Sequence, residues 1–117
     1  MIGLTEAEER FAKLLWGRVP LSSSELVKLG EREMDWKKST TYTILKRLEK
    51  KGIFQNEGGT VTALVEREDY YAKESRQFVN DTFGGSLPRF LTAFTRREKL
   101  KPEEIAELRR LIEQCDE

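Results

Sequence analysis

Apolar residues recur at the three- and four-residue spacing of amphipathic helices through most of the first 52 positions. The first helix opens with Thr5 and Glu8, the Ser/Thr-x-x-Glu pattern of a capping box. Ser22 and Glu25 repeat that pattern and open a second, short helix, which we expect to stop at Gly30. The residues expected to face the core from the first helix are Leu4, Ala7, Phe11, Leu14 and Leu15.

The third helix, expected from about Trp36 to Lys51, has one apolar side and one polar, basic side. Gly52 follows it as a left-handed stop. Because positions three, four and seven residues apart share one side of a helix, we expect four inward residues: Thr41, Ile44, Leu45 and Leu48. The opposite side carries Ser39, Tyr42, Thr43, Lys46, Arg47 and Lys50.

The helical spacing gives way to short β-prone runs after Gly52. Residues 53–55 predict a strand, residues 56–59 a turn, and residues 60–65 a returning strand. Three helices and a hairpin are the element order of a winged helix-turn-helix, in which a helix enters the DNA groove and the hairpin is the wing. The wing tip carries Glu57 and neither lysine nor arginine, so we expect any DNA contacts there to be weak or made by backbone N–H groups.

Residues 69–117 return to helical periodicity in three further amphipathic segments. Gly84 and Gly85 break the first, Ser86 caps the second, and Pro102 begins the third. We therefore expect a mainly α fold with a small β-hairpin wing. It comprises a winged helix-turn-helix DNA-binding domain at 1–68 and a helical dimerisation region at 69–117.

The apolar sides of these last helices can be covered by the winged domain of the same chain or by a second copy. The 117-residue chain is 38% hydrophobic and 36% charged, which is lean for a self-sufficient monomer of this size. We therefore favour a homodimer over an intramolecular core. The candidate dimerisation residues are Tyr71, Phe78, Phe83, Leu87, Phe90, Leu91, Phe94, Ile105, Leu108, Leu111 and Ile112.

The positive charge is concentrated on the third helix. Residues 37–51 hold six basic and one acidic residue, whereas the whole chain is neutral. A local basic helix of this kind is typical of a DNA-binding surface, although an isolated one is more often a solvated helix. The candidate DNA-binding residues are Lys37, Lys38, Ser39, Thr40, Tyr42, Thr43, Lys46, Arg47 and Lys50, with Lys51 as a further phosphate candidate.

Within that set, the base-edge candidates are Thr40, Tyr42 and Thr43, because residues near the start of such a helix contact bases. Two alternatives stay open: Tyr42 packs against Trp36 or the wing, and Arg47 pairs with an acidic side chain. Trp16 and Trp36 are expected to be core or hinge aromatics.

Composition argues against catalysis and metal binding. The chain has no histidine and a single cysteine, Cys115, and we find no phosphate-binding glycine loop, so we expect no catalytic residues, metal or cofactor. No apolar run approaches a membrane span and no secretory signal opens the chain, so we expect a cytoplasmic protein without membrane insertion. The rival to DNA binding is a winged-helix protein-interaction module.

Several segments together resemble one known family. They are residues 4–8, 14–16, 35–36, 47–48, 50–52, 64–65, 83–87, 103–105 and 107–109, with Thr40 and Thr43. Over nearly its whole length the chain resembles the penicillinase and methicillin-resistance repressors, the BlaI/MecI family. The glycine-glycine junction at 84–85 and the acidic last helix are the most specific of these features.

The resemblance implies a homodimeric transcriptional repressor of a palindromic operator, of a β-lactam-resistance or cell-envelope-stress type. It also implies release by proteolysis in the helix after Gly85, with a membrane receptor-protease as partner. The bond equivalent to the family's Asn-Phe cleavage site is Ala93–Phe94, where asparagine is replaced by alanine. Tyr42 stands where relatives often have arginine or glutamine, so we expect the operator sequence to differ from that of those relatives. Cys115 is the single cysteine of the chain, which does not fit a copper sensor.

Overall fold

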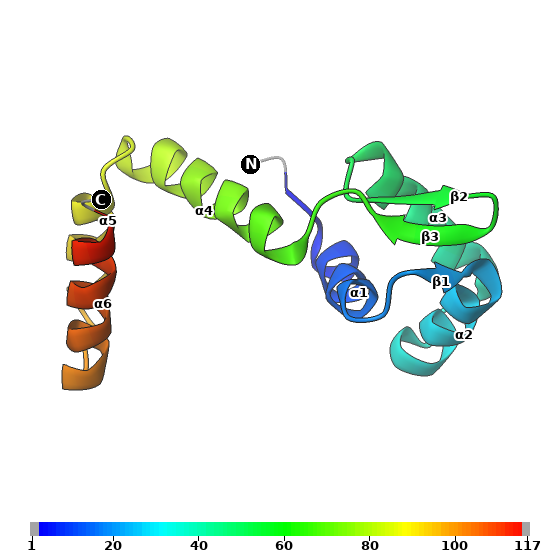
Figure 1. Ribbon diagram of the computed structural model, residues 1–117, viewed down its shortest axis with the longest axis horizontal. Helices are drawn as coiled ribbons and strands as arrows, with labels where there is room; N and C mark the ends of the chain where they lie inside the picture. Colours follow the sequence, from blue (N-terminus) through cyan, green and yellow to red (C-terminus); the bar gives the residue numbers. More distant parts are fainter. Residues whose placement is uncertain (1–2, 116–117) are drawn as a thin grey trace. The chain divides into compact units, whose positions relative to one another are not determined.

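The computed structural model describes residues 3–115 and divides into two compact units, one ending at Ser75 and the other beginning at Arg76. Figure 1 shows the succession of helices and strands along the chain. The elements are α1 (Glu6–Trp16), β1 (Leu21–Ser22), α2 (Ser23–Met34), α3 (Lys38–Lys50), β2 (Phe54–Glu57), β3 (Thr60–Ala63), α4 (Arg67–Phe83), α5 (Leu87–Phe94) and α6 (Pro102–Gln114). The mainly α winged-helix fold predicted from the sequence is confirmed.

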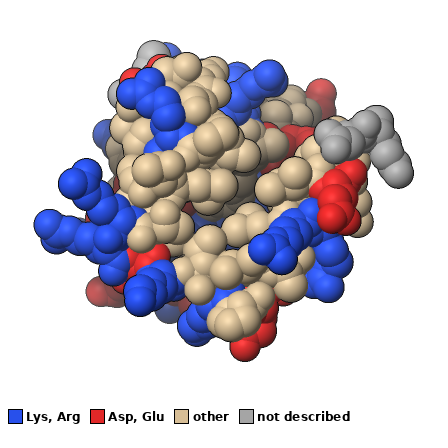
Figure 2. All heavy atoms as spheres, turned by 90° about the vertical axis from the view of Figure 1, so that its left-hand side faces the viewer, with Lys and Arg blue, Asp and Glu red and all other residues tan. Residues whose placement is uncertain are grey.

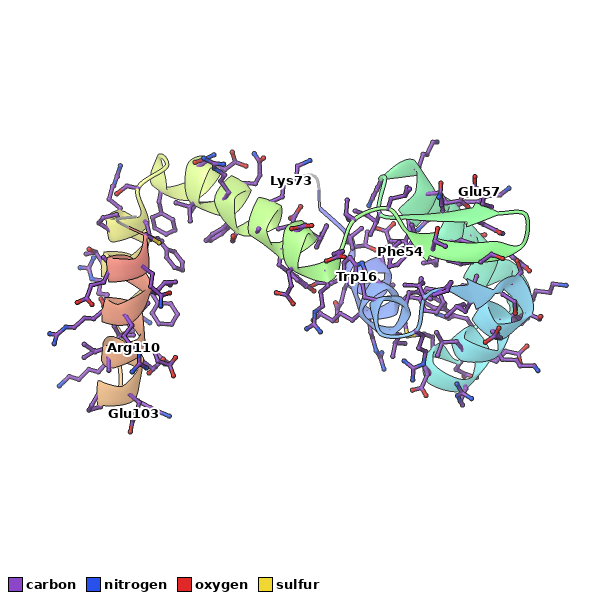
Figure 3. The ribbon with its side chains drawn as sticks, in the orientation of Figure 1. Trp16, Phe54, Glu57, Lys73, Glu103 and Arg110 are labelled. Carbon is purple, nitrogen blue, oxygen red and sulfur yellow. The ribbon has the colours of Figure 1, made fainter. Side chains whose placement is uncertain are left out.

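The core of the first unit is formed by α1, α2, α3 and the small sheet. Aromatic and aliphatic side chains from all of these elements are excluded from water, and this apolar burial is the main stabilising contribution. The buried apolar residues are Phe11, Ala12, Leu15, Leu21, Leu26, Leu29, Ile44, Leu45, Leu48, Ile53, Phe54 and Val61. Figure 3 labels Phe54, which belongs to this core, and Trp16, which packs against it; their ring centroids lie 5.4 Å apart.

Both predicted capping boxes are present. The side-chain oxygen of Thr5 accepts a hydrogen bond from the N–H of Glu8 (3.2 Å), and the Glu8 carboxylate accepts one from the N–H of Thr5 (2.8 Å). Ser22 and Glu25 make the same reciprocal pair at the start of α2. The inward side of α1 was predicted less well, because Ala7 is exposed and Glu8 is buried in its place.

The predicted end of α2 at Gly30 is wrong. The helix continues for another turn to Met34 and ends at Asp35, which adopts a left-handed conformation with φ of 54°. Gly30 is buried where α2 packs on α3, and a Cβ there would overlap Thr41 Oγ1 and lie 3.3 Å from Thr41 Cβ and Cγ2. The glycine therefore allows two helices to approach closely and does not stop a helix.

The sheet has three strands in the order β1-β3-β2, and its first strand was not predicted. Leu21 in β1 pairs with Val61 in β3, and β2 pairs with β3 as the expected hairpin. The strands are shifted from the prediction: β2 runs to Glu57 and β3 ends at Ala63. The turn between them is the pair Gly58 and Gly59, both with positive φ.

The second unit contains the C-terminal part of α4 with α5 and α6. The expected break at Gly84 and Gly85 is present, with φ of 59° and 81°, and Ser86 caps α5 by accepting a hydrogen bond from the N–H of Arg89. None of the residues in α4, α5 or α6 is buried. No helix within residues 3–115 has the length and apolar character needed to cross a membrane.

Candidate nucleic-acid interface

The orientation of α3 about its own axis is fixed by its inward side. Thr41, Ile44, Leu45 and Leu48 are all buried, as the helical spacing predicted. Ile44, Leu45 and Leu48 belong to the core of the first unit, and Thr41 packs against Gly30 on α2. Because a rigid helix with one side anchored presents the other side in a defined direction, the outward residues of α3 are also placed.

The outward side of α3 brings the predicted DNA-binding residues together. Only Tyr42 is half-buried, since its ring also packs against the margin of the core. The basic side chains at positions 37, 38, 46, 47 and 50 form no ion pair within residues 3–115. The alternative in which Arg47 pairs with Glu49 is therefore not found. The exposed members of the set are Lys37, Lys38, Ser39, Thr40, Thr43, Lys46, Arg47 and Lys50.

The hydroxyl group of Thr43 is already engaged within α3. Its Oγ1 donates a hydrogen bond to the carbonyl oxygen of Ser39 (2.9 Å), a common arrangement for threonine inside a helix. Thr43 is nevertheless exposed, so its oxygen and its methyl group are accessible from outside the helix. In this rotamer Thr43 can accept a hydrogen bond from a base amino group or contact a thymine methyl, but it does not donate.

The two tryptophans are structural, as expected. The Trp36 ring packs on Phe11 with centroids 5.0 Å apart, which anchors the segment that leads into α3. The indole N–H of Trp16 donates to the carbonyl oxygen of Val65 (3.0 Å), and its ring also contacts Tyr70. These contacts hold the entry to α3 and the exit from the wing against α1.

An ion pair links the first turn of α1 to the end of α3. The Nζ of Lys51 donates to the Glu8 carboxylate and to the carbonyl oxygen of Gly3 (3.2 Å). Burial by itself raises the pKa of the Glu8 carboxyl, but hydrogen bonds from Lys51 and Thr5 together with the lysine charge outweigh it, so the pKa is lowered from its ordinary value. No local sequence pattern predicts this pair, because its members lie 43 residues apart.

The lowered pKa of Glu8 predicts a pH-dependent contribution to stability. The stabilisation is fully present above the ordinary glutamate pKa of about 4.3 and is lost as the pH falls through the lowered pKa, because the unfolded chain then binds the extra proton. We expect Glu8→Gln to reduce the free energy of unfolding by about 2 kcal/mol at neutral pH, since it weakens hydrogen bonds to a charged group.

Denaturant titrations of both proteins from pH 7 downwards measure this difference. The gap between wild type and variant should narrow below about pH 4.3. Glu25, whose pKa is also lowered by hydrogen bonds from Ser22, contributes equally to both curves. A gap that stays constant across the acid range would show that the Glu8 charge does not stabilise the fold.

The wing is tied to the start of α2. The N–H of Ser23 donates to the carbonyl oxygen of Gly59 (3.0 Å), and the Asn56 side chain accepts from the N–H of Gly59 (3.1 Å). Glu57 is exposed on the hairpin, as labelled in Figure 3, and the tip itself is the glycine pair. A glycine tip without a basic side chain is consistent with the expectation that any DNA contacts of the wing are weak or made by backbone N–H groups.

The second unit exposes an apolar surface built around phenylalanine rings. Phe90 lies at its centre, with ring centroids 6.1 Å from Phe78, 5.5 Å from Phe83 and 6.1 Å from Phe94. Figure 2 shows one face of the molecule, on which residues other than Lys, Arg, Asp and Glu cover much of the area and Lys and Arg gather toward the rim. A groove between α5 and α6 continues this surface, and its apolar walls are formed by Phe90, Leu91, Phe94, Leu100, Leu108 and Leu111.

The predicted dimerisation residues fall into two groups. All of those from position 78 onward are exposed or half-buried in α4, α5 and α6 of the second unit. Tyr71 differs, because it lies in the first unit, where its hydroxyl donates to the Glu9 carboxylate on α1 (3.0 Å) and its ring packs on Trp16 and Tyr70. Tyr71 therefore holds the first turns of α4 against α1 in its own chain.

Comparison with known proteins gives consistent matches along the chain. The profile of a family described as "Penicillinase repressor" matches residues 4–114. The methicillin resistance regulatory protein MecI of Staphylococcus aureus (strain Mu50) is 28% identical over 113 residues, which cover 93% of this chain and 92% of that protein. The penicillinase repressor of Bacillus licheniformis is 29% identical over 115 residues, covering 95% and 90%. The penicillinase repressor of Staphylococcus aureus is 24% identical, covering 95% and 91%.

Proposed function

The chain belongs to the penicillinase repressor family, and we propose that it is a dimeric, sequence-specific DNA-binding repressor of a β-lactam-resistance or cell-envelope-stress operon. The family is one of transcriptional repressors and not of enzymes. The family membership that the resemblance in the sequence implies is thereby confirmed. The observation that carries the proposal is the outward side of α3, an unpaired basic surface on a helix whose inward side is fixed by the core.

In this proposal α3 enters the major groove of a palindromic operator. Thr40, Tyr42 and Thr43 contact base edges, and the lysines and arginine around them contact phosphates. Tyr42 offers one hydroxyl and an aromatic edge in place of a bidentate side chain, so its base preference should differ from that of an arginine or glutamine. The neutralised phosphates make binding fall steeply with salt, because each releases counterions.

Dimerisation is proposed to occur through residues 69–117, with 1–68 as the DNA-binding part. The support is the absence of any buried residue in α4, α5 and α6 although their apolar sides are extensive. A second copy covers such a surface most simply, since exposed apolar patches of this extent mark interaction sites. In the dimer, two α3 helices lie about 34 Å apart, or a multiple of that, to reach successive grooves.

Release of the operator is proposed to follow from loss of the dimer. Ala93 and Phe94 lie near the end of α5 and are exposed in the single chain, and since Phe94 belongs to the proposed dimer surface, a membrane receptor-protease would reach the bond between them when this part of the dimer opens. A cut there would separate α6 from the rest of the dimer surface. The two protomers would then come apart, and each would bind its half of the operator weakly by itself. The proposal places the repressor in the cytoplasm, where its operator lies.

Reversing one charge on α3 tests the DNA-binding proposal. We expect Lys46→Glu to weaken binding to a mixture of random-sequence duplexes by about tenfold or more, because it replaces a phosphate contact by repulsion. Lys73→Glu on α4 makes the same change at an exposed lysine outside the proposed surface and should have little effect; Figure 3 labels Lys73. Fluorescence anisotropy at constant salt measures both. Equal effects of the two variants would favour the protein-interaction module.

A further inference from the structure

Two neighbouring lysines at the end of α3 have different environments. Both residues are exposed, but Lys50 forms no ion pair within residues 3–115, whereas the Lys51 ammonium is bonded to the Glu8 carboxylate and to the carbonyl oxygen of Gly3. The Glu8 side chain is only 1% exposed, so its carboxylate depends on Lys51 and on the N–H of Thr5 for charge compensation and hydrogen bonds. The basic end of α3 therefore contains two lysines with separate roles.

We propose that Lys51 is a positioning residue, which holds α3 at the angle needed to read bases, and that it makes no phosphate contact. This inference rests on the proposed DNA-binding function. Glu8 is its partner, and together the two residues join the end of the DNA-reading helix to the start of α1.

The cost of moving Lys51 supports this role. Glu8 and Gly3 accept hydrogen bonds from two of the three N–H groups of the Lys51 ammonium, and any movement toward a phosphate would take this group away from a buried carboxylate, which is strongly unfavourable without its cation. The backbone N–H of Lys51 also donates to the carbonyl oxygen of Arg47 (3.0 Å), so its main chain is fixed as the last turn of α3. The side chain is therefore held at both ends.

The location of the pair explains why it affects base reading. Thr41 against Gly30 fixes the first half of α3 on α2, and Lys51 fixes the opposite end on α1. Leu48 already holds this end of α3 in the core, and the ion pair adds a directional link to the first turn of α1 that restricts small tilts of the helix. Base contacts need precise placement, while phosphate contacts tolerate small shifts because the charge acts over a distance.

Identical substitutions at the two lysines separate the roles. The probes are the duplex that the wild type selects from a random library and a duplex of unrelated sequence, each titrated over a range of salt concentrations. Lys50→Met should weaken binding to both duplexes by the same factor and reduce the slope of log K against log salt by about 0.9. Lys51→Met should weaken binding to the selected duplex about tenfold, leave binding to the unrelated duplex unchanged, and preserve the slope.

Variants at Glu8 test the same role without leaving a buried carboxylate unpaired, which could unfold the Lys51→Met protein. Glu8→Gln leaves the lysine charge in place but weakens its anchor, so we expect weaker binding to the selected duplex. If Lys51 contacted a phosphate, removing a nearby negative charge would strengthen binding instead. The double variant Glu8→Gln/Lys51→Met, which leaves no unpaired charge, should reproduce the loss of selectivity while its thermal unfolding shows a folded protein.

The outcomes distinguish this inference from the proposed function. A slope reduced by about 0.9 in Lys51→Met, or unchanged selectivity in a folded variant, would overturn the positioning role and leave DNA binding intact. Failure of the wild type to bind either duplex would overturn the proposed function and this inference with it.

Discussion

Replacing Leu111 with aspartate is expected to convert the proposed dimer into a folded monomer that binds the operator at least about a hundredfold more weakly. Leu111 is 55% exposed and lines the groove between α5 and α6, so a charge there costs little in the isolated chain. In the dimer the same carboxylate would be buried without a partner. Binding by two linked DNA-reading units then reverts to binding by one.

A matched control is available on the same helix. Ala106→Asp introduces the same charge at an exposed position that does not line the groove, and it should leave mass and affinity unchanged. Analytical ultracentrifugation and operator titration measure the two effects separately. A Leu111→Asp protein that keeps the dimer mass would contradict the proposed dimer surface.

The second large effect is expected at the contact between α2 and α3. Gly30→Ala should reduce the free energy of unfolding by about 2 kcal/mol, because the clash of the new methyl group with Thr41 outweighs the better helix propensity of alanine. Thr41→Ala in the same chain removes the Oγ1 and Cγ2 atoms that the new methyl group would meet, and Oγ1 is a buried oxygen without a hydrogen-bond partner among residues 3–115. The double variant should therefore be more stable than the sum of the single effects predicts.

Urea denaturation of the four proteins in this double-mutant cycle measures the coupling, expected to be about 1 kcal/mol or more. Gly17→Ala is the control, since Gly17 has φ of −80° and a Cβ there would meet only the carbonyl oxygen of Leu14, at 3.9 Å. Additive effects of Gly30→Ala and Thr41→Ala would show that the two positions do not compete for the same space.

The contact between Gly30 and Thr41 separates what the sequence predicts about the fold from what it does not. Periodicity predicted the inward side of α3 correctly, because that side follows from the turn of the helix alone. The low helix propensity of glycine predicts a stop at Gly30, but the tertiary contact with Thr41 overrides that preference. The strand β1 has only two residues, which are too few to show the apolar-polar alternation of a strand. It forms because β3 pairs with it.

The site was predictable to a similar extent. Charge and spacing identified which residues of α3 face outward, since these are local properties of one helix. They did not show that the Thr43 hydroxyl is engaged within the helix or that Lys51 is paired with a buried glutamate. The latter depends on how α1 and α3 pack, which no local pattern encodes. Tyr71 was grouped with the C-terminal aromatics by spacing, yet its hydroxyl bonds to α1.

The central claim is that this chain reads a palindromic DNA sequence as a dimer. Selection of bound duplexes from a random library by the purified full-length protein, near physiological salt, tests it most directly. We predict recovery of an inverted repeat whose half-sites are separated by about 10 base pairs or a multiple of that, with a base preference opposite Tyr42 that changes in Tyr42→Gln. Recovery of no motif from folded, dimeric protein would contradict the claim.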